Sequence, residues 1–387
     1  MKQLAIDIDI LAHDSKTGVY YYTQRLLAAL LARPRAYGVT LAYFGKAQPL
    51  SDWELPAGSA TVRAVTWLPR KLYRLTLRTV AALPFDLMTG VRADAFLFTK
   101  VVALPLVRRV PNAVVIHDTA YVDYPDVMEN WHFRKYLEWG VPRGIKRASL
   151  VITISESTKS RLMELYGVPE QKIRLIPPAV DHAAYHPYEE PEVARVREKF
   201  GITKPYILSV CTLEPRKNLV TLLRACADFP PELLRDYQLV LAGRKGWHNA
   251  ELDTLLDELG KKISIVVTGY VLNEDLPVLY AGAAVFVLPS LYEGFGMPVL
   301  EAMACGAPVI TANNSSLPEV AGEAGVLVEA LDVAGLCQAM VDVLHDDQRR
   351  ARMRRAGLAR AQAYSWEKSA TLLANVIDEL MESGSKA

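Results

Sequence analysis

Residues 285–320, VFVLPSLYEGFGMPVLEAMACGAPVITANNSSLPEV, determine the interpretation of the whole chain. The segment begins with Val285–Pro289, which is apolar, β-branched and aromatic, and too short for a helix, so it predicts a strand. A glycine-containing loop follows at residues 293–296, and Pro298–Cys305 is expected as a helix. Pro308–Ala312 is expected as a second strand. The pattern is one strand–loop–helix–strand unit of an α/β protein.

The loop of this unit has the properties of an anion-binding site. Gly294 and Gly296 allow backbone N–H groups to approach a ligand closely, and the N-terminus of the following helix favours negative charge. Glu293 precedes the helix and Glu301 lies within it; a carboxylate repels phosphate but accepts hydrogen bonds from sugar hydroxyls. Phosphate and sugar hydroxyls together describe a nucleotide sugar. The alternative is an ordinary βαβ unit with surface glutamates.

The string EGFGMPVLEAMACGAPVI, with Glu293 and Glu301 eight positions apart, resembles the retaining glycosyltransferases of family 4. The resemblance implies the α/β GT-B fold, in which two doubly wound Rossmann-like domains face each other across a cleft. It also implies that Glu301 holds the ribose hydroxyls and Glu293 the donor sugar. The remaining donor-binding residues of this segment are expected to be Gly294, Phe295, Gly296, Met297 and Pro298.

The composition indicates an ordered cytoplasmic protein. With 387 residues the chain is long enough for two domains, and its 51% hydrophobic and 22% charged residues are typical of globular proteins. No apolar run approaches the roughly 18 residues of a membrane span. Asp7 and Asp9 interrupt what would be the apolar region of a signal peptide. The four cysteines have neither metal-binding nor disulfide spacing and are expected to be reduced: Cys211, Cys226, Cys305 and Cys337.

Short strands alternate with helices twice, which predicts an N-terminal acceptor-side domain at residues 1–180 and a C-terminal nucleotide-sugar-binding domain at 181–364. Residues 181–198, which contain two prolines and many charges, are expected as the linker. The resemblance implies that the last helix, in residues 365–387, crosses back to the first domain. At the other end, Gln3–Leu11 is expected as the first strand.

Two places in the first domain are candidates for contact with the substrates. Gly18 lies at the start of the predicted helix Tyr20–Leu31, where it is either part of an anion site or a plain turn glycine. His117 and Asp118 follow an apolar strand, at the edge where open α/β sheets bind ligands, although a lone histidine is more often structural. The resemblance implies that Gly18 faces the donor diphosphate and that His117-Asp118 lies beside the transferred sugar. This chain has Thr17-Gly18 where many relatives have two glycines.

In the second domain, Glu214-Pro215-Arg216-Lys217-Asn218 follows the predicted strand Tyr206–Thr212 and begins a predicted helix. The guanidinium fork of Arg216 and the point charge of Lys217 suit a diphosphate leaving group, whereas taken alone they could be a solvated pair. The resemblance implies that they are the phosphate-binding pair. It also implies that the backbone of Gly269, Tyr270 and Val271 lies beside the nucleotide base.

The expected activity is transfer of a hexose from a nucleotide sugar to a hydroxyl group, with retention of configuration implied by the resemblance. The catalytic residues are expected to be His117, Asp118, Arg216, Lys217 and Glu293. No D-x-D pair is placed in a loop where it would hold Mg²⁺, so neither a metal nor another cofactor is expected. The strings TGVYYYT, HDT and EPRKN, with the glycine loop, are most similar to bacterial mannosyl- and rhamnosyltransferases of polysaccharide assembly. GDP-mannose is therefore the expected donor, and a saccharide or polyprenyl-linked saccharide the expected acceptor.

Three alternatives remain open for the activity. The donor could be a UDP- or dTDP-sugar on the same fold. The chain could be a sugar-nucleotide 2-epimerase, which the segment Glu293–Glu301 together with Arg216-Lys217 disfavours. It could also be a catalytically silent sugar-nucleotide-binding protein, although Arg216, Lys217 and Glu301 are all retained.

The charges are unevenly distributed. Residues 1–180 contain 24 Lys and Arg against 15 Asp and Glu, a net charge of +9, whereas the remainder has 20 against 28, a net charge of −8. Residues 63–78, RAVTWLPRKLYRLTLR, carry five cations among apolar side chains. They fit either an amphipathic helix on the inner face of the plasma membrane or a core helix with a solvated cationic side. No nucleic-acid-binding motif accompanies these charges, so nucleic acid is not an expected partner.

Overall fold

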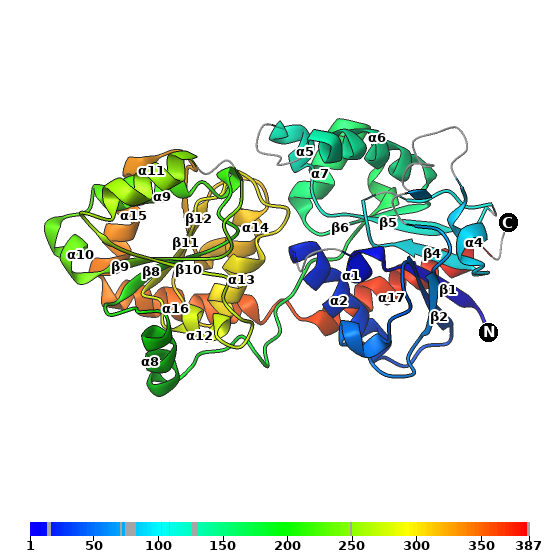
Figure 1. Ribbon diagram of the computed structural model, residues 1–387, viewed down its shortest axis with the longest axis horizontal. Helices are drawn as coiled ribbons and strands as arrows, with labels where there is room; N and C mark the ends of the chain where they lie inside the picture. The colour runs from blue at the N-terminus through cyan, green and yellow to red at the C-terminus, as the bar shows by residue number, and fades with distance from the viewer. Residues whose placement is uncertain are drawn as a thin grey trace. The chain divides into compact units, whose positions relative to one another are not determined.

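The computed structural model describes residues 1–13, 17–69, 72–73, 83–101, 103–107, 109–125, 131–247 and 250–384. The chain forms two compact units (Figure 1). Unit 1 consists of Met1–Val122, Asn130–Pro178 and Trp366–Ala387, and unit 2 of Asp123–Glu129 and Ala179–Ser365. The end of the chain therefore belongs to the same unit as its beginning.

Unit 1 is built on a seven-stranded parallel sheet in the order β3-β2-β1-β4-β5-β6-β7. β4 and β5 are buried along their whole length, as expected for parallel strands covered on both faces. The order reverses between β1 and β4, which places a topological switch point there. The strands are β1 (Gln3–Asp7), β2 (Gly38–Phe44), β3 (Thr61–Val65), β4 (Ala95–Phe98), β5 (Asn112–Ile116), β6 (Leu150–Thr153) and β7 (Ile173–Leu175).

The helices of the N-terminal half are α1 (Asp9–His13), α2 (Gly18–Leu31), α4 (Phe85–Thr89), α5 (Ala120–Asp123), α6 (Trp131–Arg147) and α7 (Glu156–Tyr166), with 3-10 turns at Leu50–Trp53 and Glu170–Lys172. α7 has the ends that its sequence predicts. The Ser155 side chain accepts a hydrogen bond from the backbone N–H of Thr158, and Gly167 ends the helix in the left-handed conformation.

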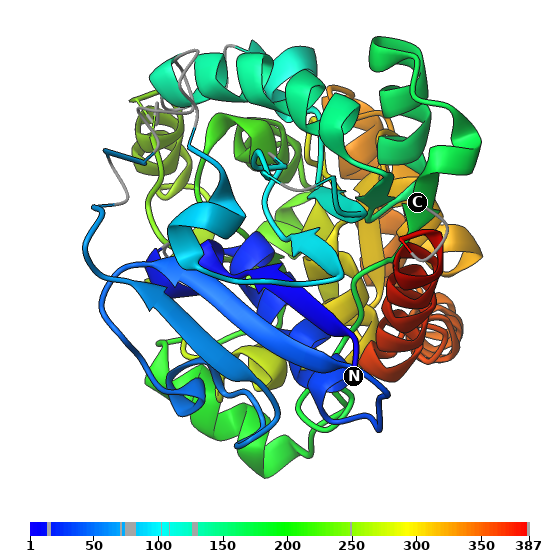
Figure 2. The same cartoon turned by 90° about the vertical axis from the view of Figure 1, so that its right-hand side faces the viewer.

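The last helix, α17 (Trp366–Ser383), packs against α2 (Figures 1 and 2). Its inner side buries Leu373 and Ile377 completely. Two polar contacts fix its C-terminal half: the Lys2 ammonium donates to the carbonyl of Met381 at 2.8 Å, and Arg174 pairs with Glu379 at 2.6 Å. α17 is thus an integral part of unit 1.

Unit 2 has a six-stranded parallel sheet in the order β10-β9-β8-β11-β12-β13. The order reverses between β8 and β11, so this sheet also has a switch point at its centre. The strands are β8 (Tyr206–Val210), β9 (Gln238–Ala242), β10 (Ser264–Gly269), β11 (Val285–Leu288), β12 (Val309–Ala312) and β13 (Val326–Val328).

A core of leucine, isoleucine, valine and methionine side chains lies between this sheet and helices such as α9 and α15, with Leu222, Leu241 and Met340 completely buried. The helices of unit 2 are α8 (Glu190–Lys199), α9 (Leu219–Ala227), α10 (Pro231–Asp236), α11 (Ala250–Leu259), α12 (Leu276–Ala281), α13 (Met297–Ala304), α14 (Leu317–Ala321), α15 (Val333–His345) and α16 (Asp347–Ala361). Short 3-10 turns lie at Pro215–Lys217 and Gly322–Ala324.

Two expectations about local structure were wrong. The first strand ends at Asp7 instead of Leu11, because the Asp7 carboxylate accepts from the N–H of Asp9 and the chain turns into α1. The expected linker is only partly irregular, since α8 begins at Glu190. Glu189 and Glu192 form a capping box at the start of α8, and Pro191 occupies its first turn, a position that proline favours.

The basic segment at residues 63–78 is described only in part. Its first residues belong to β3, and the Trp67 side chain is 66% exposed. Residues 70–71 and 74–82 lie outside the described part of the chain, and the predicted amphipathic helix falls largely on them. Within the described ranges, no helix is both long and apolar enough to cross a membrane.

Candidate functional site

Three loops meet the carboxyl edge of the unit 2 sheet at its switch point. β8, β11 and β12 are neighbours in this sheet, so the loops that follow them lie at the same edge. The loop after β8 leads to the 3-10 turn Pro215–Lys217, and the loop after β11 is the glycine-containing segment 289–296. The loop after β12 is Asn313-Asn314-Ser315-Ser316.

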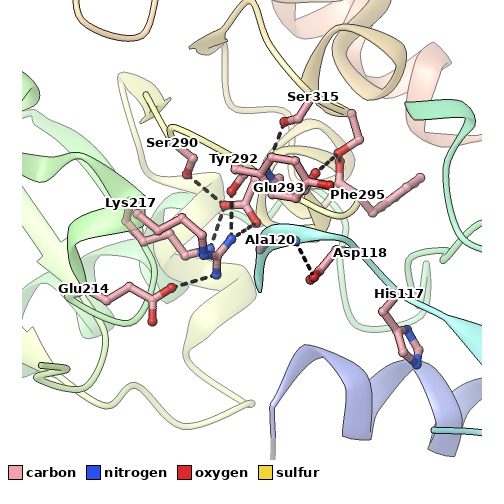
Figure 3. A network of polar contacts seen from close by, with 12 residues as sticks. His117, Asp118, Ala120, Glu214, Lys217, Ser290, Tyr292, Glu293, Phe295 and Ser315 are labelled. Atoms are coloured by element: carbon pink, nitrogen blue, oxygen red, sulfur yellow. Dashed lines mark hydrogen bonds and ion pairs between the residues drawn. The ribbon is translucent and has the colours of Figure 1, made fainter. Parts of the chain in front are cut away.

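Arg216, Lys217 and Glu293 lie together in one network of ion pairs. Figure 3 shows Lys217 and Glu293 with Glu214 and Ser290 around them. The Lys217 ammonium contacts one carboxylate oxygen of Glu293 at 2.6 Å, and the Arg216 guanidinium contacts the other at 3.1 Å. A second nitrogen of Arg216 donates to Glu214 at 2.7 Å. The Ser290 hydroxyl donates to Glu293 at 2.8 Å. Two cations and two carboxylates are thereby concentrated at the end of β8 and β11.

Burial and charge act in opposite directions on Glu293, whose side chain is 9% exposed. Burial alone would raise its pKa, but the charges of Lys217 and Arg216 lower the pKa to about 2. Glu293 is therefore ionised throughout the physiological pH range. In this state the carboxylate of Glu293 forms ion pairs with Arg216 and Lys217, the same two cations that would bind an anionic ligand.

The cations lie in a short 3-10 turn directly before α9, which begins at Leu219, one residue after the helix start that the sequence predicted. Asn218 has φ = 57°, in the left-handed region that asparagine tolerates better than most residues, and this residue separates the 3-10 turn from α9. Its side-chain amide donates to the carbonyls of Pro289 at 3.0 Å and Ala330 at 2.6 Å. Asn218 therefore ties the cation-bearing loop to the loop after β11.

The glycine loop is held from behind by the loop after β12. The Ser316 hydroxyl lies 2.8 Å from the carbonyl oxygens of both Glu293 and Phe295, and the N–H of Glu293 donates to the Ser315 hydroxyl at 3.0 Å (Figure 3). Gly296 has φ = 107°, and a Cβ there would lie 2.9 Å from Leu317. The loop conformation therefore requires glycine at 296, directly before α13 begins at Met297 and continues with Pro298.

Glu301 lies on α13, apart from the ion-pair network. It is partly exposed and accepts a hydrogen bond of 3.0 Å from the hydroxyl of the fully buried Tyr280. Burial raises the pKa of Glu301 to about 7, because the hydrogen bond from Tyr280 offsets only part of the desolvation. The two glutamates of the E-x7-E pattern therefore differ: Glu293 is ionised throughout the physiological pH range, whereas Glu301 titrates near neutral pH.

The segment Gly269-Tyr270-Val271 ends β10. Gly269 has φ = 70°, which glycine adopts without strain. Val271 is buried, whereas Tyr270 is 45% exposed and its ring lies 4.4 Å from the Arg244 guanidinium carbon. Gly294 is partly exposed in its loop, and Phe295 is buried.

In unit 1, the structure places His117 in the interior. One ring nitrogen, Nε2, lies 3.3 Å from the Thr99 carbonyl, while the other, Nδ1, is buried and has no hydrogen-bond partner among the described residues. The His117 ring lies nearly perpendicular to the Tyr22 ring, with 5.3 Å between the ring centroids. Burial lowers the pKa of His117 below its usual value, although the Thr99 contact and the charge of Asp118 act in the opposite direction. A neutral ring with Nε2–H donating to Thr99 leaves Nδ1 able to accept a hydrogen bond.

The other two predicted residues of unit 1 have simpler environments. The Asp118 carboxylate accepts from the N–H of Ala120 at 3.1 Å, at the start of α5 (Figure 3). Gly18 is exposed at the first position of α2, where a Cβ would meet no atom within 4 Å. Among the described residues of unit 1, no atom therefore blocks the space next to the Gly18 Cα.

Several residues of the site were not anticipated from sequence. They are Glu214, Tyr280, Ser290, Asn314, Ser315 and Ser316 in unit 2, and the pair Asp9–Lys100 at the unit 1 switch point, at 2.8 Å. The Asn-Asn-Ser-Ser sequence after β12 could have indicated that this loop supports a neighbouring one, because short polar side chains in a loop commonly hydrogen-bond to nearby backbone. Within the described residues, no three His, Cys, Asp or Glu side chains are grouped as for a metal ion.

The sequence matches two family descriptions that together span both units. Residues 17–184 match glycosyltransferase family 4, and residues 192–360 match glycosyl transferases group 1. The chain is 36% identical to the O-antigen chain mannosyltransferase B of Escherichia coli over 272 residues, which are 70% of this chain and 71% of that protein. It is 31% identical over 62% of its length to the serotype-specific mannosyltransferase WbdA of Escherichia coli, of which it spans 30%.

The fold has close structural relatives as well. Sucrose-phosphate synthase from Thermosynechococcus elongatus superposes with a TM-score of 0.73 at 22% identity, covering 99% of this chain and 100% of the other. The fold is GT-B, with two parallel-sheet Rossmann-like domains. The chain belongs to the family 4 glycosyltransferases and is a glycosyltransferase, as the sequence predicted.

Proposed function

We propose that this chain transfers mannose from GDP-mannose, with retention of configuration and without a metal ion, to a hydroxyl of a saccharide or lipid-linked saccharide. The observation that carries the proposal is the network of Arg216, Lys217 and Glu293 beside the glycine loop, at the switch point of the unit 2 sheet. It combines cations for a diphosphate with a carboxylate for sugar hydroxyls.

The proposed donor site divides these roles among neighbouring groups. The diphosphate lies against Arg216, Lys217 and the N–H groups of the glycine loop from Gly294 to Met297, at the positive end of α13. Its charge displaces Glu293 from the two cations, and the freed carboxylate accepts hydrogen bonds from the donor sugar. Glu214 keeps its contact of 2.7 Å with Arg216 and so holds the guanidinium in place during this exchange.

The nucleoside is held on the other side of the glycine loop. Glu301 in its ionised form accepts from two ribose hydroxyls. The backbone of Gly269, Tyr270 and Val271 lies beside the base. Because these contacts are the same before and during the reaction, they contribute to donor binding more than to turnover.

The chemical step cleaves the bond between the anomeric carbon and the diphosphate. Negative charge develops on the departing phosphate oxygen, where Arg216, Lys217 and the loop N–H groups stabilise it. The acceptor hydroxyl attacks on the face from which the diphosphate leaves, and the leaving phosphate takes its proton, which retains the configuration. In unit 1, Nδ1 of neutral His117, which has no hydrogen-bond partner among the described residues, is proposed to accept a hydrogen bond from a hydroxyl of the transferred sugar. Asp118 and Gly18 are further proposed contacts of the donor.

Mannose as the transferred sugar is supported by two relatives, which are named O-antigen chain mannosyltransferase and serotype-specific mannosyltransferase. Guanine is supported by a relative named as a GDP-mannose-dependent mannosyltransferase of Mycolicibacterium smegmatis, to which the chain is 34% identical over 54% of its length and 56% of that protein. The name O-antigen chain mannosyltransferase supports a growing saccharide chain as acceptor. The cytoplasmic side of the membrane is the proposed location of the enzyme. The test is incubation of the purified chain with radiolabelled GDP-mannose and a membrane fraction containing lipid-linked saccharides. We expect label in the lipid-linked fraction and an α-linked mannose by NMR; a β-linked product would overturn retention, and label from UDP- or dTDP-sugars alone would overturn the donor.

Activity is expected to survive chelation. Arg216 and Lys217 supply the positive charge that Mg²⁺ provides to a diphosphate in metal-dependent transferases, so excess EDTA should leave the rate of GDP release unchanged. The measurement is the initial rate with EDTA and with added Mg²⁺ or Mn²⁺. Complete loss in EDTA that either ion restores would refute the metal-free mechanism.

Donor affinity is expected to fall on the acid side of neutrality. The pKa of Glu301 is about 7 in the free protein, and only the carboxylate accepts from both ribose hydroxyls, so binding at lower pH first requires loss of a proton. The dissociation constant of GDP should therefore be about tenfold higher near pH 6 than on its plateau at alkaline pH. Calorimetric titration across this range measures it.

Two variants identify the titrating group. Glu301→Gln cannot titrate and should lose this pH dependence. Tyr280→Phe removes the hydrogen bond that lowers the pKa of Glu301, so its transition should move to higher pH. An unchanged pH profile in Glu301→Gln would show that another group is responsible.

A further inference from the structure

Arg244 lies in the loop 243–246 that follows β9, at the carboxyl edge of the unit 2 sheet. Its side chain is exposed, and its guanidinium carbon lies over the Tyr270 ring, 4.4 Å from the ring centroid. No acceptor among the described residues receives a hydrogen bond from this guanidinium, and no carboxylate there pairs with it. The neighbouring Lys245, by contrast, forms an ion pair with Asp253 at 2.7 Å. The N–H donors of Arg244 are therefore available to a ligand.

The backbone around Arg244 is held against the loop that follows β8. The N–H of Leu213 donates to the carbonyl of Arg244 at 2.9 Å, and the N–H of Gly246 donates to the carbonyl of Leu213 at 3.0 Å. At the other end of the loop, a Cβ at Gly243 would lie 1.7 Å from the carbonyl oxygen of Cys211, so this close approach requires glycine. The loop that carries Arg244 is therefore anchored to the loop that leads to the cations of the ion-pair network.

The segment on which Arg244 stacks has backbone groups without partners. β10 pairs with β9 as far as Gly269, whose carbonyl accepts from the N–H of Gly243 at 2.8 Å. Beyond it, no backbone hydrogen bond joins Tyr270 or Val271 to another described residue, although the Val271 side chain is buried. Backbone groups in this state suit the edge of a planar ligand, which is the role proposed above for this segment toward the nucleotide base. A base in that place would lie within reach of the Arg244 side chain.

We propose that Arg244 selects guanine by donating two hydrogen bonds from its guanidinium to O6 and N7 of the base, with the Tyr270 ring holding the guanidinium in position. This rests on the proposed function and deepens it, because it names the side chain that distinguishes a GDP-sugar from other nucleotide sugars.

The chemistry of the bases explains the selection. Guanine presents O6 and N7 as two neighbouring acceptors, which match the two parallel N–H donors of a guanidinium. Uracil and thymine present O4 beside a C–H or a methyl group, so they can use only one donor of the fork. Adenine presents N7 beside an amino group, which itself donates and therefore opposes the guanidinium. The same fork thus favours guanine over the bases of UDP-, dTDP- and ADP-sugars.

Tyr270 acts on the base through Arg244 and is a positioning residue. The ring contacts the face of the guanidinium, whereas the N–H groups donate in the guanidinium plane, so stacking leaves them free. Stacking also restricts the rotamers of a long side chain before the ligand binds, which reduces the entropy lost on binding. The Tyr270 ring is 45% exposed, so its contact with Arg244 is not required to fill the core of unit 2.

Calorimetric titration of the full chain with GDP and with UDP is the first test. Arg244→Ala should weaken binding of GDP by roughly 10- to 100-fold and leave binding of UDP nearly unchanged, since one bidentate contact to a base discriminates on this scale. Arg244→Lys keeps the charge but not the fork and should also lose most of the preference. Lys245→Ala is the matched control and should bind both nucleotides like the wild type. Equal losses for GDP and UDP in Arg244→Ala would show that Arg244 attracts the diphosphate, and no loss for GDP would likewise overturn the proposal.

A change in the ligand identifies the atom that Arg244 contacts. In 7-deaza-GDP a C–H replaces N7, so the wild type should bind it roughly tenfold more weakly than GDP. Arg244→Ala has no donor for N7 and should bind the two ligands equally. The same ratio of the two dissociation constants in the wild type and in Arg244→Ala would place N7 away from Arg244 and overturn the proposal.

Variants of Tyr270 test the positioning role. Tyr270→Phe keeps the ring and should keep the ratio of the GDP and UDP dissociation constants, whereas Tyr270→Leu should reduce this preference for GDP. A merely structural role would weaken both nucleotides alike. A wild type that binds GDP while Arg244→Ala binds it equally well rejects this role of Arg244 alone. A wild type that binds neither nucleotide, or UDP more tightly than GDP, rejects the proposed donor and with it this role.

Discussion

Arg216→Ala and Lys217→Ala are each expected to lower kcat by roughly 100-fold or more, as does removal of one donor that stabilises charge in a transition state. In the proposed mechanism both side chains stabilise the charge that develops on the diphosphate, and each variant leaves only one of the two cations to do so. The measurement is GDP release at saturating GDP-mannose. Lys245→Ala is the control, since Lys245 is an exposed lysine of the same unit that also forms an ion pair, with Asp253 at 2.7 Å; its rate should match the wild type.

The two variants differ in their structural consequences. Lys217→Ala removes a partner of the buried Glu293 carboxylate, so we expect it to lower the free energy of unfolding by about 1–3 kcal/mol. Arg216→Ala leaves the contact of 2.6 Å between Lys217 and Glu293 in place and should perturb folding less. A loss of turnover in Arg216→Ala without a matching loss of stability therefore reports the chemical role. Wild-type turnover in both variants would remove the assigned leaving-group site.

Glu301→Ala is expected to weaken binding of GDP by about 10- to 100-fold, because each hydrogen bond to a charged group contributes roughly 1.5–3 kcal/mol and part of this is offset by water. kcat at saturating donor should change little, since the ribose contact is the same in the ground state and the transition state. Calorimetry for GDP and steady-state kinetics for GDP-mannose measure the two effects. Glu251→Ala, which removes an exposed glutamate of α11 in the same unit, is the control.

The kinetic pattern distinguishes the two glutamates. If Glu301→Ala lowered kcat as much as it raised KM, Glu301 would contact the reacting part of the donor and not the ribose. The difference from wild type should also diminish below about pH 7, where Glu301 is increasingly protonated in the wild type.

The sequence predicted the fold well wherever the spacing of apolar residues and the glycine and proline residues at the ends of an element indicated the same helix or strand. Val285–Pro289 was expected as a strand and β11 is Val285–Leu288; Pro298–Cys305 was expected as a helix and α13 is Met297–Ala304. Errors occurred where one signal was given too much weight. Proline and acidic residues suggested a linker after Asp181, although proline in a first turn with glutamates on both sides is equally a helix start, which is what α8 shows.

The composition of the site was predictable, but its internal contacts were not. Arg216, Lys217 and Glu293 could be named from their motifs, yet 76 positions separate Lys217 from Glu293 and only the sheet order brings them together. The same holds for Ser315 and Ser316, which support the glycine loop from a different strand. The pKa difference between Glu293 and Glu301 also depends on three-dimensional neighbours: two cations for one, and Tyr280 with surrounding apolar groups for the other.

The central claim is that unit 2 binds the nucleotide of a GDP-sugar, and ranking nucleotides by thermal shift tests it most directly, because no acceptor is needed. Wild-type protein is heated with GDP, UDP or dTDP at equal concentrations, with Arg216→Ala and Glu301→Ala in parallel. GDP at about 100 times its Kd should stabilise the wild type by about 2.7 kcal/mol, with smaller effects of UDP and dTDP and a reduced effect of GDP in both variants. Stabilisation by UDP and not by GDP would contradict the GDP-mannose assignment, and stabilisation by none of the three would contradict the site itself.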